Sequence, residues 1–175
     1  MADQQLFFID LNTGAGIAGE STKVPHVNWM ECASWSFSMH QTADSSLGTT
    51  AGTGTAAIGS FSFERAIDRA SPRLMDRCSR GSHIPTVAFE GERQGTAAAG
   101  DVAAGSTPST VYIRLVFTDV VISGRTTNWS DGSRGTETIS FAFGQVQMTH
   151  TQILTTGQIG ARTSKQYNAK ANLAS

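Results

Sequence analysis

Apolar and polar residues alternate over several segments of this chain, and a period of two residues is typical of a β-strand with one buried face. The segments are separated by runs rich in glycine, serine and threonine, which favour turns and loops. The pattern therefore predicts a chain dominated by strands. The six predicted strands are at about Leu6–Leu11, Val27–Met39, Ile58–Ile67, Ile84–Glu90, Val111–Ser123 and Glu137–Thr149.

Two of the predicted strands depart from a simple alternation. In the third, the apolar phase holds Phe61, Phe63 and Ile67 but also the charged Arg65. In the last, the apolar phase changes at Gly144, which indicates a β-bulge because glycine tolerates the backbone of a bulged residue.

After the third strand the apolar residues recur at helical spacing, which predicts one short helix at about residues 72–80. Ser71 is expected to be its N-cap, and Pro72 suits the first helical position. Gly81 suits the left-handed position that follows a helix. Arg77 and Arg80 lie in the last turn, where the helix dipole favours cations.

These elements predict a mainly β fold, namely a small antiparallel β-barrel or sandwich with one short α-helix and long Gly-rich loops. The loops are expected at Gln41–Ala57, Arg93–Ser109 and Gly124–Thr136. A chain of 175 residues fits one domain. We expect residues 1–150 to form the barrel and residues 151–175 to form a polar C-terminal extension of the same domain.

The composition indicates which partners are not favoured and in which cellular compartment the protein is expected to fold. The formal net charge is −1, so nothing favours nucleic acid or insertion into an anionic membrane. The start of the chain lacks the basic and apolar regions of a signal peptide, so we expect it to be made and folded in the cytoplasm. Cys32 and Cys78 are accordingly interpreted as reduced thiols rather than a disulfide.

No pattern of catalytic, cofactor-binding or metal-binding residues is visible in the sequence. Gly14–Gly19 matches G-x-G-x-x-G, but Pro25 and the β-branched residues before it prevent the helix that a dinucleotide site needs, so these glycines are assigned to a hairpin loop. The four histidines are too far apart for a local zinc motif, and there is no G-x-S-x-G elbow. Glu90 and Glu92 are interpreted as a solvated edge face.

The helical block resembles a known family. Residues 68–83, with their Asp-Arg-Ala-Ser-Pro turn, Leu-Met pair, Cys78 and Gly-Ser-His exit, are similar to the central segment of the haemolysin-coregulated proteins (Hcp). These proteins form the inner tube of the bacterial type VI secretion system. The resemblance extends over nearly the whole chain. Its other segments are Gly19–Ser21, His26, Ala33–Phe37, Tyr112–Leu115, Asp119–Ser123, Thr136–Phe141, Tyr167–Asn168 and Asn172.

The resemblance implies a structural function and no enzymatic activity. Subunits would close into homohexameric rings, and the rings would stack into a tube that carries and stabilises secreted effector proteins in its lumen. Further partners would be the contractile sheath and the spike of the same system. The protein would be cytoplasmic when assembled and would then be secreted without a signal peptide.

The resemblance and the strand pattern together suggest two functional surfaces. Ser34, Ser36 and Ser38 lie opposite the apolar phase of their strand, which the resemblance places in the ring wall, so they are candidates for the face toward lumen and cargo. The loop at Gln41–Ala57 is the candidate for ring-to-ring stacking. Its candidate residues are Gly48, Thr49, Gly52 and Gly54.

Two other functions remain open from the sequence. The tryptophans Trp29, Trp35 and Trp129 suit a pocket for a sugar or another small ligand in a cytoplasmic β-barrel, although each is equally well explained as a packing residue. A phage tail-tube subunit would have a fold close to the one predicted here. The oligomeric state in solution separates the tube subunits from a monomeric or dimeric ligand-binding barrel.

Overall fold

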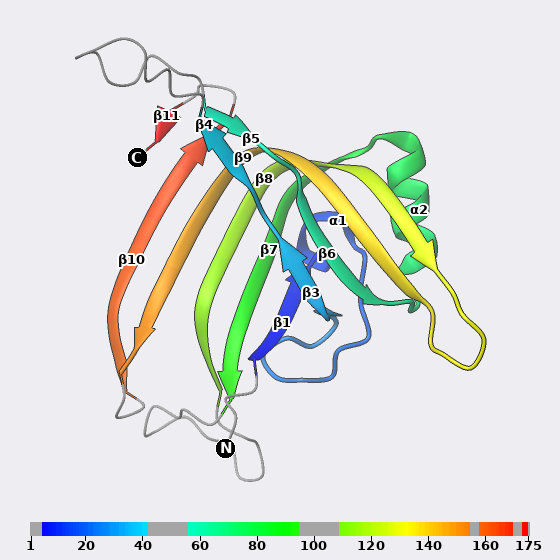
Figure 1. Ribbon diagram of the computed structural model, residues 1–175, viewed down its shortest axis with the longest axis horizontal. Coiled ribbons are helices and arrows are strands. Elements are labelled where there is room, and N and C mark those ends of the chain that lie inside the picture. The colour runs from blue at the N-terminus through cyan, green and yellow to red at the C-terminus, as the bar shows by residue number, and fades with distance from the viewer. Residues whose placement is uncertain (1–4, 42–55, 95–108, 155–157, 170–172, 175) are drawn as a thin grey trace.

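A computed structural model describes residues 5–41, 56–94, 109–154, 158–169 and 173–174. The described part is mainly antiparallel β-structure with two short helices (Figure 1). The strands are β1 (Gln5–Asp10), β2 (Met30–Cys32), β3 (Ser34–Ser36), β4 (Met39–Gln41), β5 (Ala56–Ile58), β6 (Phe61–Ala66), β7 (His83–Gln94), β8 (Ser109–Asn128), β9 (Thr136–Ile153), β10 (Ile159–Asn168) and β11 (Leu173–Ala174). The helices are α1 (Asn12–Ala15) and α2 (Ser71–Arg80).

The sheet closes on itself to form a nearly complete barrel. Strands β1, β7, β8, β9 and β6 pair in that order, each antiparallel to the next. Strand β2 pairs with β1, and β3, which follows it after the single residue Ala33, pairs with β6. The predicted antiparallel barrel is therefore confirmed. The strand predicted at Val27–Met39 is wrong in two respects: it begins only at Met30, and it is divided into β2, β3 and the start of β4.

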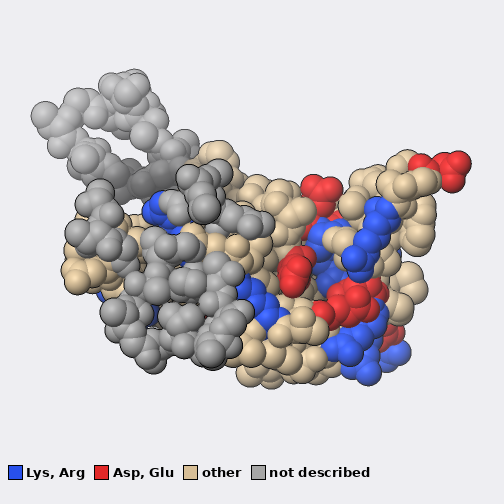
Figure 2. Space-filling model, turned by 90° about the horizontal axis from the view of Figure 1, so that it is seen from below, with Lys and Arg blue, Asp and Glu red and all other residues tan. Residues whose placement is uncertain are grey.

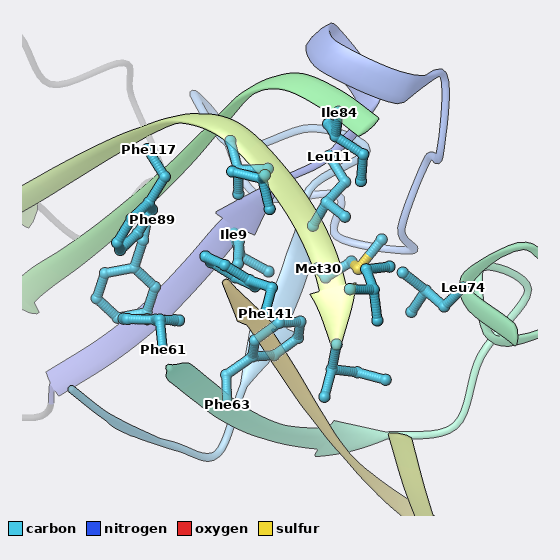
Figure 3. Close-up of a cluster of buried hydrophobic side chains, with 14 of the residues drawn as sticks. Ile9, Leu11, Met30, Phe61, Phe63, Leu74, Ile84, Phe89, Phe117 and Phe141 are labelled. Atoms are coloured by element: carbon cyan, nitrogen blue, oxygen red, sulfur yellow. The ribbon is translucent and has the colours of Figure 1, made fainter. Parts of the chain in front are cut away.

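The barrel core consists largely of aromatic rings from the inward phase of the strands (Figure 3). Phe61 lies among Phe117, Phe141 and Phe89, with ring centroids 4.8, 5.1 and 5.3 Å from its own. Trp35 packs against the same group, 5.8 Å from Phe61. Such contacts stabilise a core beyond the free energy of area burial alone.

Helix α2 is present where the sequence predicts it, and its end signals are partly as expected. Gly81 has φ of 59°, the left-handed conformation that the prediction requires. Ser71 is not the N-cap, because the helix begins one residue earlier than expected and Ser71 is its first residue. Ala70 is the N-cap residue, and no side chain caps the helix. Asp68 Oδ1 accepts a hydrogen bond of 2.7 Å from the Ala70 N–H, which stabilises the turn before the helix.

A second helix was not predicted. Residues Asn12–Ala15 form one helical turn, α1, which overlaps the start of the Gly14–Gly19 segment that the sequence analysis assigns to a hairpin loop. Asp10 Oδ1 accepts hydrogen bonds from the Asn12 and Thr13 N–H groups at 2.8 and 3.1 Å, which stabilises the start of the turn. Gly16 ends it with φ of 67°.

The predicted bulge at Gly144 is wrong, although the change of apolar phase is real. The register of β8 and β9 is the same on both sides of Gly144, with Thr118 opposite Gln145 and Val120 opposite Phe143. Both strands change phase together at this level, where Asp119 of β8 has φ of 55°. The register shifts further along, between Ile122 and Gly124.

The polar segment after His150 contains structure that the sequence analysis did not predict. Strand β9 continues to Ile153, and β10 pairs with its C-terminal half from Ile159 to Asn168. This pairing extends the sheet beyond the barrel, so that β10 lies at the far left of Figure 1 and the tip of the β8–β9 hairpin at the far right.

Candidate functional site

The serines singled out from the sequence lie on the outside of the barrel. Ser34 and Ser36 of β3 and Ser38, which follows the strand, are all exposed. Trp35 between them points inward and packs on the core. The remaining candidate residues, Gly48, Thr49, Gly52 and Gly54, lie outside the described residues.

The serine row of β3 is part of a wider polar surface. Ser36 is directly opposite Ser62 of β6, and Ser62 is opposite Ser140 of β9, with 2.7 Å between the last two hydroxyl oxygens. Side chains of directly opposed residues share one face of a sheet. We call the set Ser34, Ser36, Ser62, Thr138 and Ser140 the hydroxyl face.

One carboxylate lies within the hydroxyl face. Glu64 is opposite Ser34 on one side and Thr138 on the other, and the Ser34 hydroxyl donates a hydrogen bond of 3.3 Å to its Oε2. The sequence analysis missed Ser62, Thr138 and Ser140. The alternation around them marks these residues as outward-facing, but only the strand order shows that they adjoin β3.

A buried histidine, His26, lies against strands β1 and β7. His26 is fully buried, with Nε2 2.8 Å from Glu90 Oε2 and Nδ1 3.2 Å from Glu92 Oε1. Lys23 pairs with Glu92 at 2.7 Å. The interpretation of Glu90 and Glu92 as a solvated edge is therefore wrong, because the segment that carries Lys23 and His26 covers both carboxylates.

The contacts of His26 with its aromatic neighbours indicate a structural role for this cluster. The His26 ring stacks on Phe8 with 4.3 Å between centroids, and Trp29 packs edge-on against it at 4.6 Å. Buried charged groups are tolerated in proteins when they are paired in this way. Within the described residues, no group of three or more His, Cys, Asp or Glu side chains is arranged to hold a metal ion.

A second buried network ties α2 to the barrel. Arg65 pairs through Nε with Glu137 Oε1 at 2.9 Å and through its terminal nitrogens with Asp68. Glu137 also accepts hydrogen bonds from Arg125 Nε and Ser71 Oγ, both at 2.7 Å. The side chains of Arg65 and Glu137 are 1% and 0% exposed. The network joins β6, β9, β8 and the first residue of α2.

The cysteines and tryptophans are dispersed. Both cysteines are free thiols, and burial raises the pKa of Cys32, which suppresses its reactive thiolate form. Trp35 packs in the core, Trp29 contacts His26, and Trp129 is 73% exposed at the β8–β9 turn. The three tryptophans thus occupy three separate environments and give no support to a shared ligand pocket.

Comparisons with known proteins agree with this architecture. Residues 8–150 match the family model described as "Type VI secretion system effector, Hcp". The chain is 28% identical over 133 residues to Protein hcp1 of Pseudomonas aeruginosa, which covers 75% of this chain and 76% of that protein.

Solved structures show the same fold over nearly the whole chain. A type VI secretion system effector from Yersinia pestis is 26% identical and has a TM-score of 0.67, over 93% of this chain and 98% of that one. Hcp1 from Salmonella typhimurium is 23% identical and has a TM-score of 0.71, over 97% and 98% of the two chains.

The fold and these matches define a structural protein of type VI secretion rather than an enzyme. The chain belongs to the Hcp family of tube and effector proteins. Neither helix among the described residues is long and apolar enough to cross a membrane.

Proposed function

We propose that this protein assembles into homohexameric rings, that the rings stack into a tube, and that the hydroxyl face lines the lumen and holds secreted effectors during transport. The observation that carries the proposal is the continuity of the hydroxyl face across β3, β6 and β9. A barrel whose core is already filled by its own side chains offers this face as a wall rather than as a pocket.

The chemistry of the hydroxyl face suits a cargo that must be held and then released. Each hydroxyl donates one hydrogen bond and accepts others, so it engages many protein surfaces without requiring one partner. Neutral hydrogen bonds that replace bonds to water contribute only about 0.5–1.5 kcal/mol each. A wall of hydroxyls therefore binds through many weak contacts, while Glu64 adds a local preference for cationic groups.

The remaining partners follow from the same assembly. The tube would be built in the cytoplasm inside the contractile sheath, with the spike at its end. On contraction, it would leave the cell together with its effectors. The stacking of rings is assigned to the loop at residues 42–55, which joins the paired strands β4 and β5.

The first prediction is a hexamer in solution. One chain has a mass of 18.5 kDa, so light scattering after size-exclusion chromatography should give a mass six times larger. Negative-stain electron microscopy of the same fraction should show rings. A mass near that of a single chain at micromolar concentration would contradict the proposal.

The second prediction tests the lumen assignment. Replacing Ser36 with glutamine should leave the ring mass unchanged, because Ser36 is exposed and lies outside the core. The longer side chain would project into the lumen and weaken cargo contacts, so effector retained on purified rings should fall about fivefold, equivalent to about 1 kcal/mol. Co-purification of a co-expressed effector measures this retention.

A matched substitution tests whether the loss of cargo is specific to the hydroxyl face or follows from any exposed serine-to-glutamine change. Ser79 is an exposed serine on α2, away from the hydroxyl face, and Ser79→Gln should retain cargo as the unchanged protein does. Equal retention by Ser36→Gln and Ser79→Gln rings would remove the hydroxyl face from the cargo site.

A further inference from the structure

The outer edge of β10 has almost no strand partner. Its inner edge pairs with β9, whereas its outer edge pairs with β11 only at Tyr167 and Asn168. From Ile159 to Gln166 the outer edge therefore faces outward without a partner strand in the described part of the chain (Figure 1). Such an edge presents a row of backbone donors and acceptors that another chain can engage.

The C-terminal segment that contains β10 carries positive charge only. Residues 142–175 contain three Lys or Arg and no Asp or Glu, whereas residues 1–141 contain ten Lys or Arg and fourteen Asp or Glu. Arg162 and Lys165 of β10 are exposed and form no ion pair with any described residue. In Figure 2, the acidic side chains that are visible among the described residues lie in the half of the molecule that carries α2 and the β8–β9 turn.

The positive charge restricts which surface can dock on β10. Two β10 edges repel each other, so pairing of like edges is disfavoured. A partner must instead bring a negative group, and it gains most if it also covers the exposed apolar side chains here. These are Met148, Leu154 and Ile159, which are 42%, 39% and 54% exposed.

The turn between β8 and β9 has the two features that such a partner needs, an apolar side chain and a negative charge. Trp129 is exposed, and one side of its ring packs so closely on Gly135 that a Cβ there would be 2.7 Å from Trp129 Cε3. The turn is closed by hydroxyls of Ser130 and Ser133 that lie 2.6 Å apart. An exposed tryptophan that already packs on its own backbone is the type of residue that anchors protein interfaces.

The same turn supplies a free carboxylate. Asp131 is exposed and has no ion-pair partner among the described residues. The neighbouring cation, Arg134, is near Glu20, with 3.7 Å between the charged atoms, and donates to the Ile67 carbonyl. The turn therefore combines an aromatic anchor with an unpaired negative charge, at the opposite end of the molecule from β10 (Figure 1).

We propose that the β8–β9 turn of one copy docks on the β10 edge of the next. Trp129 covers Met148, which lies directly opposite Lys165, and Asp131 pairs with Lys165. The contact joins two different surfaces of identical chains, which is the head-to-tail arrangement that closes a ring. This inference rests on the proposed ring assembly and names the surfaces that hold the ring together.

Two variants test the contact, each damaging one of its sides. Trp129→Ser removes the anchor of the turn, and Arg162→Glu with Lys165→Glu reverses the charge of the β10 edge. Each variant alone should lose the ring, with the dissociation constant of the contact raised about 30-fold or more. Mass by light scattering reports the loss, and circular dichroism reports that the subunits remain folded.

Mixing the two variants gives the decisive result. The turn variant keeps an intact β10 edge, and the edge variant keeps an intact turn, so the mixture should form a one-to-one dimer that cannot grow into a ring. A charge swap in one chain, Asp131→Lys with Lys165→Asp, should retain the ring that Asp131→Lys alone weakens. No dimer in the mixture, together with no recovery in the swap, would overturn the proposed contact.

The controls distinguish this inference from the proposed function. Met75→Ser and Arg80→Glu change an exposed apolar residue and an exposed cation on α2, and both should leave the ring intact. If the unchanged protein forms no ring, the proposed function itself fails. If it forms a ring that the turn and edge variants leave intact, only the contact is wrong, and the charges on β10 serve to keep a free edge from aggregating.

Discussion

Replacing Arg65 with methionine is expected to lower the free energy of unfolding by about 3–5 kcal/mol, the usual effect of removing one partner from a buried ion pair. Arg65 is 1% exposed and contacts Glu137, Asp68 and Ser71. Without it, two buried carboxylates lose their shared cation, and Arg125 compensates only one of them. Because domains are stabilised by about 5–15 kcal/mol in total, the loss should be evident in denaturant unfolding.

An exposed ion pair provides the matched control. Arg80 and Asp76 pair at 2.7 Å on the surface of α2, with side chains 70% and 52% exposed. Arg80→Met should therefore change stability by no more than about 0.5 kcal/mol. A similar small effect for Arg65→Met would show that the buried network contributes little to stability. Strong non-additivity with Glu137→Gln would show that the two residues act as a pair.

The position of Arg65 also shows how much of the fold can be predicted from the sequence. Alternation places Arg65 in the apolar phase of its strand beside Phe61 and Phe63, so its burial follows from local pattern alone. The identity of its partner, Glu137, does not follow from local pattern. Glu137 lies 72 residues away and adjoins Arg65 only because β6 pairs with the first half of β9. The strands and α2 are thus predictable from periodicity, whereas the contacts among them depend on strand order.

The same distinction explains the elements that were missed. Strand β10 is largely polar and has no buried face to give it an alternating pattern, so its extended form depends on backbone pairing with β9. Helix α1 is too short for periodicity and is stabilised by the Asp10 side chain. Glu90 and Glu92 lie on a strand face that is covered by His26 and Lys23, more than sixty residues earlier in the chain.

The residues of the candidate site also fall into two groups, those predictable from local pattern and those that depend on strand order. Alternation identifies the outward serines of β3 from the sequence, since each lies opposite an apolar neighbour. The extension of that row through Ser62 and Ser140 requires the order β3–β6–β9, which no local pattern contains. A search for sequence motifs also misses the turn at Trp129, because its relevant features are the exposure of Trp129 and its packing on Gly135.

Shortening the loop at residues 42–55 should abolish tube growth and secretion while leaving single rings intact. Strands β4 and β5 are paired up to Gln41 and Ala56, so an Asn-Gly turn between these residues would close a regular two-residue hairpin. The Tyr167 hydroxyl donates to the Ala56 carbonyl at 3.3 Å and would still hold the hairpin against the end of β10. The change removes the proposed stacking contact without disturbing the described core.

The chain provides a matched control for this deletion. The segment at residues 95–108 is equally long and connects β7 to β8, whose last pair is Gln94 and Ser109, so the same Asn-Gly replacement fits there. This second variant should form rings, tubes and secreted protein as before. Light scattering measures the rings, electron microscopy measures tube length, and protein in the culture medium measures secretion. Normal secretion by the 42–55 variant would show that its loop is dispensable, and loss of the ring itself would place the loop in the contact between neighbouring subunits rather than between rings.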